Sequence, residues 1–228
     1  MKKNAFFAGL GDYYLPSANG FDQLPYPLTN IDQLMTRLAR TGWTNQLPLK
    51  EKDASKTNIV KMLTDQINIS APDDWLLFYF AGHAAQYPMP PDAGPDKTFC
   101  VTYEPDLVAG SWPPLNTFFS VDDYAQIVSL FERKVPAGHL IAIFDCCYAY
   151  GLLNDYDIQK DFQTVIASSA AGIPTYYTDT SFFFKAFSQK WDSTFGTLGN
   201  DIAAVAQAQR LNVASIVNPA SKFINQKL

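Results

Sequence analysis

"LIAIFDCCYAYGLL", residues 140–153, runs apolar for five residues and then places Asp145, Cys146 and Cys147 in succession. Apolar residues without alternation are typical of a strand that is buried on both faces, as in a parallel sheet covered by helices. A second run of this kind, "WLLFYF" at residues 75–80, is followed closely by His83. Two buried strands are therefore expected to end beside residues with reactive side chains.

The rest of the chain alternates strand patterns with helix patterns. Apolar runs predict further strands at residues 4–10 and 162–169 and a short strand at 97–103. Apolar residues at helical spacing predict helices at residues 28–43, 53–69, 120–134, 181–191 and 197–212. Thr29 or Asn30 is expected to cap the first helix. The alternation predicts a single α/β domain, residues 1–228, with a mostly parallel central sheet of about six strands flanked by helices on both faces.

Composition and charge exclude several classes of function. The net charge is −5 and the basic residues are scattered, so no nucleic-acid partner is expected. No apolar segment reaches membrane-spanning length and no signal peptide is recognisable, which predicts a cytoplasmic protein without a membrane partner. Three cysteines leave one unpaired and two histidines form no ligand pattern, so neither a disulfide framework nor a zinc site is expected.

The ends of the two buried strands carry the candidate chemistry. In parallel sheets, sites form beyond the carboxyl ends of the strands, where Cys147 would face His83 as a nucleophile faces its base. The backbone amides of Ala84 and Cys147 are candidates for an oxyanion hole. A buried cysteine is more often an inert apolar residue, and a histidine beside an apolar strand is more often structural. The residue pattern alone leaves both interpretations open.

Longer segments resemble the caspase-like cysteine peptidases of clan CD, family C14, and the metacaspases in particular. "LLFYFAGHA" at residues 76–84 resembles their "FYFSGHG" strand, and "IFDCCYAYGLL" at residues 143–153 resembles their "DCCHSG" nucleophile segment. Similar segments follow the family's order at residues 6–13, 24–43, 53–63, 166–177 and 181–187. The resemblance implies the caspase-hemoglobinase-like fold, and it extends to small bacterial members of the family.

This resemblance implies a Cys-His catalytic dyad. His83 would be the general base and Cys147 the nucleophile, while Cys146 would point into the core. After the nucleophile, the family has His-Ser-Gly where this chain has Tyr-Ala-Tyr at residues 148–150. The turn is therefore expected to be bulkier than in the family.

The resemblance also implies a pocket for the residue before the cleaved bond, the P1 residue. Asp145 would line this S1 pocket and favour Arg or Lys, with Asn30, Ala81 and Ser168 as its other members. The family carries a second acid where this chain has Asn30 and a serine where it has Ala81. With only one carboxylate left, a weak preference for Arg or Lys is expected.

Calcium activation is a further implication of the resemblance, although no cofactor is expected to be required. Asp122 and Asp123 resemble part of the metacaspase calcium site, and Asp96 and Asp155 lie where further oxygen ligands are expected. The same acidic pair also suits an ordinary capped helix start, in which carboxylates face the helix dipole.

The sequence thus predicts a cysteine endopeptidase that acts on a protein or peptide substrate. The alternative is a catalytically degenerate caspase-like module that binds or scaffolds a partner, because the bulky turn at residues 148–150 could obstruct the cleft. The pattern does not distinguish a monomer from a homodimer.

Overall fold

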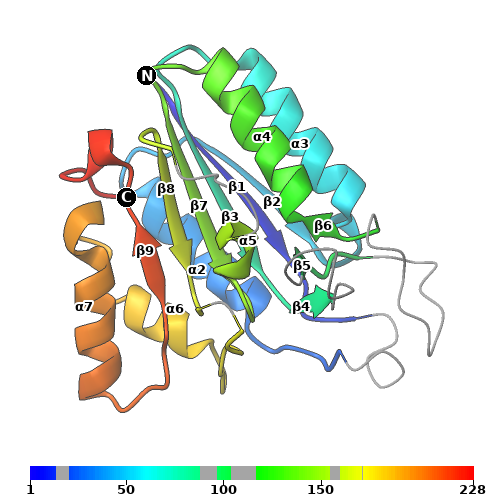
Figure 1. Ribbon diagram of the computed structural model, residues 1–228, viewed down its shortest axis with the longest axis vertical. Coiled ribbons are helices and arrows are strands. Elements are labelled where there is room, and N and C mark those ends of the chain that lie inside the picture. The colour runs from blue at the N-terminus through cyan, green and yellow to red at the C-terminus, as the bar shows by residue number, and fades with distance from the viewer. Residues whose placement is uncertain (14–20, 88–96, 104–116, 155–159, 171) are drawn as a thin grey trace.

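The computed structural model describes residues 1–13, 21–87, 97–103, 117–154, 160–170 and 172–228 (Figure 1). Among these residues, six strands form a central sheet in the order β2-β1-β3-β7-β8-β9. Neighbouring strands run parallel from β2 to β8, and β9 pairs antiparallel with β8. The strands are β1 (Lys3–Gly9), β2 (Asn45–Lys50), β3 (Trp75–Ala81), β7 (His139–Asp145), β8 (Gln163–Ala167) and β9 (Ile216–Asn218). The expected α/β fold with a mostly parallel sheet of about six strands is confirmed.

Helices cover both faces of this sheet, as Figure 1 shows. One face packs against α3 and α4, and the other packs against α2, α6 and α7. The short helix α5 follows the end of β7, and two 3-10 turns, η1 and η3, lie in connections. The bounds are α2 (Pro27–Ala39), η1 (Glu51–Asp53), α3 (Lys56–Ile69), α4 (Val121–Lys134), α5 (Gly151–Asn154), α6 (Phe182–Phe187), α7 (Phe195–Ala208) and η3 (Ser221–Phe223).

The two-sided burial explains why the central strands are apolar without alternation. Phe78 and Phe144 belong to the core under α3 and α4, whereas Tyr79 and Ile143 belong to the core under α2 and α6. All seven residues of β3 and all seven of β7 are buried. Burying each large apolar side chain contributes about 2 kcal/mol, so both strands are held firmly in register.

Serine side chains cap two helices, and the expected cap of a third helix is absent. Ser120 caps α4 in a capping box with Asp123, and Ser55 caps α3 by accepting the Asn58 amide hydrogen. The expected cap of the first helix at Thr29 or Asn30 is wrong, because α2 begins earlier, at Pro27 after Tyr26. Proline suits the first helical position, since its φ is fixed near the helical value and its missing N–H is not needed there.

A second, smaller sheet lies beside the carboxyl ends of the central strands. It consists of β4 (Ala84–Tyr87), β5 (Lys97–Cys100) and β6 (Phe119–Ser120), which pair antiparallel. The predicted short strand at residues 97–103 corresponds to β5. No apolar run of the sequence predicts β2, β4, β6 or β9, which are short or lie at a sheet edge. No helix within the described part of the chain is long and apolar enough to cross a membrane.

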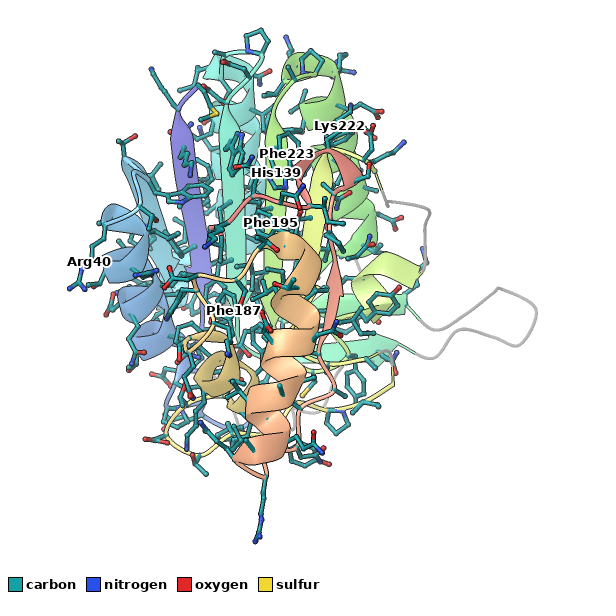
Figure 2. All side chains as sticks on the ribbon, turned by 90° about the vertical axis from the view of Figure 1, so that its left-hand side faces the viewer. Arg40, His139, Phe187, Phe195, Lys222 and Phe223 are labelled. Carbon is teal, nitrogen blue, oxygen red and sulfur yellow. The ribbon has the colours of Figure 1, made fainter. Side chains whose placement is uncertain are left out.

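A buried histidine lies at the opposite end of the sheet from the reactive residues. Figure 2 shows His139 near Phe195 and Phe223. The imidazole stacks on the Phe223 ring at a centroid distance of 4.1 Å, and its Nε2 lies 2.8 Å from the Thr164 hydroxyl oxygen. Burial, with a smaller contribution from the Lys3 ammonium, lowers the pKa of His139 to about 3. Protonating this ring in the folded state is therefore unfavourable.

His139 should make the free energy of unfolding depend on pH. Between pH 3 and 6.5 the unfolded chain binds a proton on this imidazole that the folded chain does not, so stability rises with pH across this window. The contribution lost on going from pH 8 to pH 5 is about 2 kcal/mol. We expect His139→Phe, which keeps the aromatic stacking, to remove this part of the pH dependence in urea unfolding. Identical pH profiles for the wild type and the variant would contradict the assignment.

Candidate active site

The register of β3 and β7 brings His83 and Cys147 to the same edge of the central sheet. Ala81 ends β3 and pairs with Asp145, which ends β7. The Gly82 amide then donates to the Asp145 carbonyl at 3.3 Å, so the backbone stays paired with β7 one residue beyond the end of β3. His83 lies two residues after the end of β3, and Cys147 lies two residues after the end of β7. These are matching positions on neighbouring strands, whose backbones run about 4.8 Å apart within a sheet. Sites of parallel sheets form at this edge.

His83 is held by the segment that follows β1. Its Nε2 lies 2.7 Å from the Asp22 carbonyl oxygen. Because a carbonyl only accepts hydrogen bonds, Nε2 carries the hydrogen and Nδ1 of the neutral ring carries the lone pair. The rings of Tyr13 and Phe21 pack on the imidazole at centroid distances of 4.8 and 5.4 Å. Burial lowers the pKa of His83, against the opposing effect of the Asp22 carbonyl, so the ring is a neutral base at pH 7.

Cys147 is half-buried, and its sulfur faces Thr175. The Thr175 amide donates to Sγ at 3.3 Å, and the Thr175 carbonyl oxygen lies 4.0 Å from Sγ. Burial raises the pKa of the Cys147 thiol, and the nearby Asp145 carboxyl raises it further, while the Thr175 amide opposes both. The free protein therefore holds a protonated thiol at neutral pH and not a thiolate–imidazolium pair.

The turn that carries Cys147 is braced from β8. Tyr148 has a φ of 54°, a left-handed conformation that is uncommon for residues other than glycine. The Ser168 hydroxyl accepts the Cys146 amide hydrogen at 3.0 Å and donates to the Cys146 carbonyl at 2.8 Å. Ser168, expected in the substrate pocket, thus lies against the backbone of the turn at Cys146. Cys146 is fully buried in the core, as the resemblance implied.

Asp145 is the centre of a buried hydrogen-bond network. Its Oδ2 accepts from Asn30 Nδ2 at 3.1 Å, from the Tyr79 hydroxyl at 3.0 Å and from the Ser181 hydroxyl at 2.7 Å. The Asn30 amide oxygen accepts from the Thr180 hydroxyl at 2.7 Å. Oδ1 has no hydrogen-bond partner within the described part of the chain. Burial raises the pKa of Asp145 to about 6, although the three donors stabilise the charged form.

The structure brings three of the four expected pocket residues together, and it covers them. Asn30 projects from α2, and Ala81 ends the strand beside the one that Asp145 ends. All three are 0% exposed. The Tyr26 ring, which packs against the Tyr177 ring at 5.3 Å, lies close enough to Asp145 for that carboxylate to raise the Tyr26 pKa further, after burial as the main cause.

The candidate oxyanion donors lie at the starts of the two connections. The Val101 amide donates to the His83 carbonyl at 2.9 Å, so His83 and Val101 stand at a hydrogen-bonding position next to the β4–β5 ladder, although the His83 amide itself donates elsewhere. At the next position, Ala84 and Cys100 then form a non-hydrogen-bonded pair, so the Ala84 amide points away from β5. This direction suits an oxyanion donor. The roles of the Ala84 and Cys147 amides stay predictions.

The acidic residues assigned to calcium have other partners in the structure. Asp123 Oδ2 accepts from the Ser120 amide at 2.8 Å and pairs with Lys56 at 2.9 Å, and Asp122 pairs with Lys97 at 3.3 Å. Asp96 and Asp155 lie outside the described residues. No cluster of three or more potential metal ligands occurs among the described residues. The Asp122–Asp123 pair by itself does not fit a calcium site, and calcium activation stays a prediction.

Sequence reasoning missed the groups that hold the expected site residues. The Asp22 and Thr175 contacts use backbone atoms, which leave no signal in residue identity. Tyr79 lies inside an apolar run, and nothing in that run indicates that its hydroxyl donates to Asp145. Ser181 could have been predicted as a helix cap, since serine is favoured at this position. In the structure its hydroxyl accepts the Phe184 amide hydrogen at 3.0 Å.

Comparison with known proteins identifies the family. The family model described as Caspase domain (Peptidase_C14) matches residues 4–221, so the chain belongs to the caspase family. No curated protein matches the chain. Among solved structures, the chain is similar to protein GSU0716 from Geobacter sulfurreducens, with a TM-score of 0.75 and 11% sequence identity over 100% of this chain and 98% of that chain. At this identity the likeness concerns the fold.

Ionisation of the Asp145 carboxyl group should lower the free energy of unfolding. Its pKa is 3.8 in an unfolded chain and about 6 here, so the folded state binds the extra proton between these values, and the stability that this provides is lost as pH rises through 6. Asp145→Asn keeps an oxygen for the three donors and removes the charge. From pH 3.5 to 7.5 the wild type should lose about 3 kcal/mol relative to this variant in urea unfolding. Parallel curves of unfolding free energy against pH for the wild type and Asp145→Asn would contradict the assignment.

Proposed function

We propose that this protein is a cysteine endopeptidase of the caspase and metacaspase type, with Cys147 as nucleophile and His83 as general base. The observation that carries the proposal is the register of β3 and β7, which puts both residues at matching positions beyond adjacent parallel strands. Membership of the caspase family supports it. The Asp22 carbonyl supports it further, because it occupies Nε2 of His83 and leaves the Nδ1 lone pair for the thiol proton.

In this mechanism the thiol and the imidazole react as a neutral pair. His83 Nδ1 takes the Cys147 proton as Sγ bonds to the peptide carbonyl carbon, and the resulting oxyanion is stabilised by the Ala84 and Cys147 amides. The imidazolium then gives its proton to the leaving amine as the C–N bond breaks. Water, deprotonated by His83, attacks the thioester, and the carboxylic acid product and the Cys147 thiol are released.

Asp145 is the group that would favour a basic P1 side chain. Asn30 donates a hydrogen bond where metacaspases have a second acid, so it removes one negative charge and orients the other carboxylate. Because the pKa of Asp145 is about 6, the carboxylate is charged above this pH and would hold Arg or Lys there. All of Asp145 is buried, so a P1 side chain would reach it only after the covering side chains move.

The burial of the expected pocket residues favours a second candidate function, a caspase-like module that binds a partner without cutting it. Asn30, Ala81 and Asp145 are inaccessible to solvent, and Tyr148 adds bulk directly after Cys147. A module of this kind would keep the fold while its pocket stayed shut.

A panel of fluorogenic peptides distinguishes these functions. We expect Arg or Lys at P1 to be cleaved faster than Leu or Gln at pH 7.5, with the preference declining below pH 6 as Asp145 is protonated. Cys147→Ala should lower turnover by at least about 1000-fold. Cys146→Ala, which removes the buried neighbouring thiol, is the matched control and should keep most of the turnover. Absence of turnover in all proteins, with and without added calcium, would favour the binding module.

Alkylation of Cys147 tests the neutral-pair description. Since the pKa of Cys147 is raised and that of His83 is lowered, iodoacetamide should react faster with each step in pH throughout the neutral range. A thiolate–imidazolium pair would instead give a rate that levels off well below neutrality. Tryptic mass spectrometry assigns the label to Cys147, and a plateau below pH 7 would contradict the description.

A further inference from the structure

Tyr13 lies against the residue that the proposed function uses as its base. The chain after β1 stays paired with β3, because the Leu10 amide donates to the Ala81 carbonyl at 3.1 Å. Three residues later, the Tyr13 hydroxyl oxygen lies 2.6 Å from the His83 backbone nitrogen and accepts its hydrogen. Tyr13 is 6% exposed, so water has little access to this bond.

The Tyr13 hydroxyl also leaves no room for a side chain at Gly82. A Cβ at Gly82 would lie 2.6 Å from the Tyr13 hydroxyl oxygen, closer than van der Waals contact allows. The glycine before His83 therefore makes room for the tyrosine oxygen. Because Gly82 has no side chain, the Tyr13 hydroxyl can reach the His83 amide from the segment that follows β1.

His83 is consequently held at its backbone, at one ring nitrogen and on its ring faces. Tyr13 supplies the backbone contact and one ring contact, the Asp22 carbonyl binds Nε2, and Phe21 supplies the other ring contact. Burial raises the pKa of Tyr13 well above its ordinary value, so the hydroxyl remains neutral at any pH at which the protein is folded and active.

We propose that Tyr13 is a positioning residue for His83: its hydroxyl fixes the main chain from which the imidazole projects, and thereby the direction of Nδ1. This inference rests on the proposed function for its effect on catalysis. The contact itself can be tested without any substrate.

Tyr124 provides a matched control. Its hydroxyl accepts the Gln163 side-chain amide hydrogen at 2.6 Å, and its side chain is fully buried on α4. Tyr124→Phe thus removes the same chemical group from an equally short hydrogen bond, in the core and away from His83. A loss that reflects only a missing buried hydroxyl should appear equally in both variants.

We expect Tyr13→Phe to lower kcat on the best peptide of the panel by about 10- to 100-fold with KM within twofold, because a displaced base reacts poorly while substrate binding persists. Tyr124→Phe should change kcat by less than twofold at a similar loss in Tm. Equal kcat effects in the two variants would overturn the proposal.

Nitrogen NMR of the His83 imidazole separates this inference from the proposed function. The wild type should show the Nε2–H tautomer with a slowly exchanging hydrogen; Tyr13→Phe should lose this protection and shift the imidazole pKa toward 6.5, while Tyr124→Phe should not. An inactive wild type with these signals would end the peptidase proposal and keep the positioning role. Unchanged His83 signals in Tyr13→Phe would overturn the role.

A double-variant comparison covers the case in which Tyr13→Phe is poorly folded. Gly82→Ala should be strongly destabilising in the wild type, because the new methyl group meets the tyrosine oxygen. The same change in Tyr13→Phe should lower Tm by clearly less, because that oxygen is gone. Additive losses of Tm would contradict the arrangement.

Discussion

Parallel pairing between β3 and β7 is the constraint on which the candidate site depends. The register runs from the Trp75–His139 pair to the Ala81–Asp145 pair, and both strands are buried along their whole length. If β3 slipped by one residue against β7, its side chains would exchange faces, and Tyr79 would move from the side of α2 and α6 to the side of α3 and α4. The same apolar burial that prevents this slip sets where His83 and Cys147 emerge. The geometry of the site is thus a consequence of how the core is packed.

The Asp145 network ties this edge to the helices on one face of the sheet. Asn30 from α2, Tyr79 from β3 and Ser181 at the start of α6 all donate to the same carboxylate oxygen. Burying a carboxyl group where its pKa is about 6 costs stability at neutral pH, and an apolar residue would avoid that cost. Such a cost is typical of functional sites.

The candidate dyad is held in its neutral form by its surroundings. Burial disfavours both the imidazolium of His83 and the thiolate of Cys147. The Asp22 carbonyl and the Tyr13 hydroxyl orient His83 without adding a formal charge. On the other strand, the Ser168 hydroxyl braces the backbone of Cys146. Neutral hydrogen-bonding groups therefore support both members of the dyad.

The sequence by itself determined the elements that depend on local pattern. The apolar runs of β3 and β7, the helical spacing of α3 and α4 and the positions of His83 and Cys147 just beyond strand ends follow from burial and periodicity along the chain. Only the tertiary structure decided that Asn30 serves Asp145 and not a helix cap, and that Tyr13, Asp22 and Thr175 meet the dyad residues across 70, 61 and 28 positions of sequence. Long-range contacts of this kind use backbone atoms and single hydroxyls, whose partners are selected by strand register and loop path, and no local pattern records them.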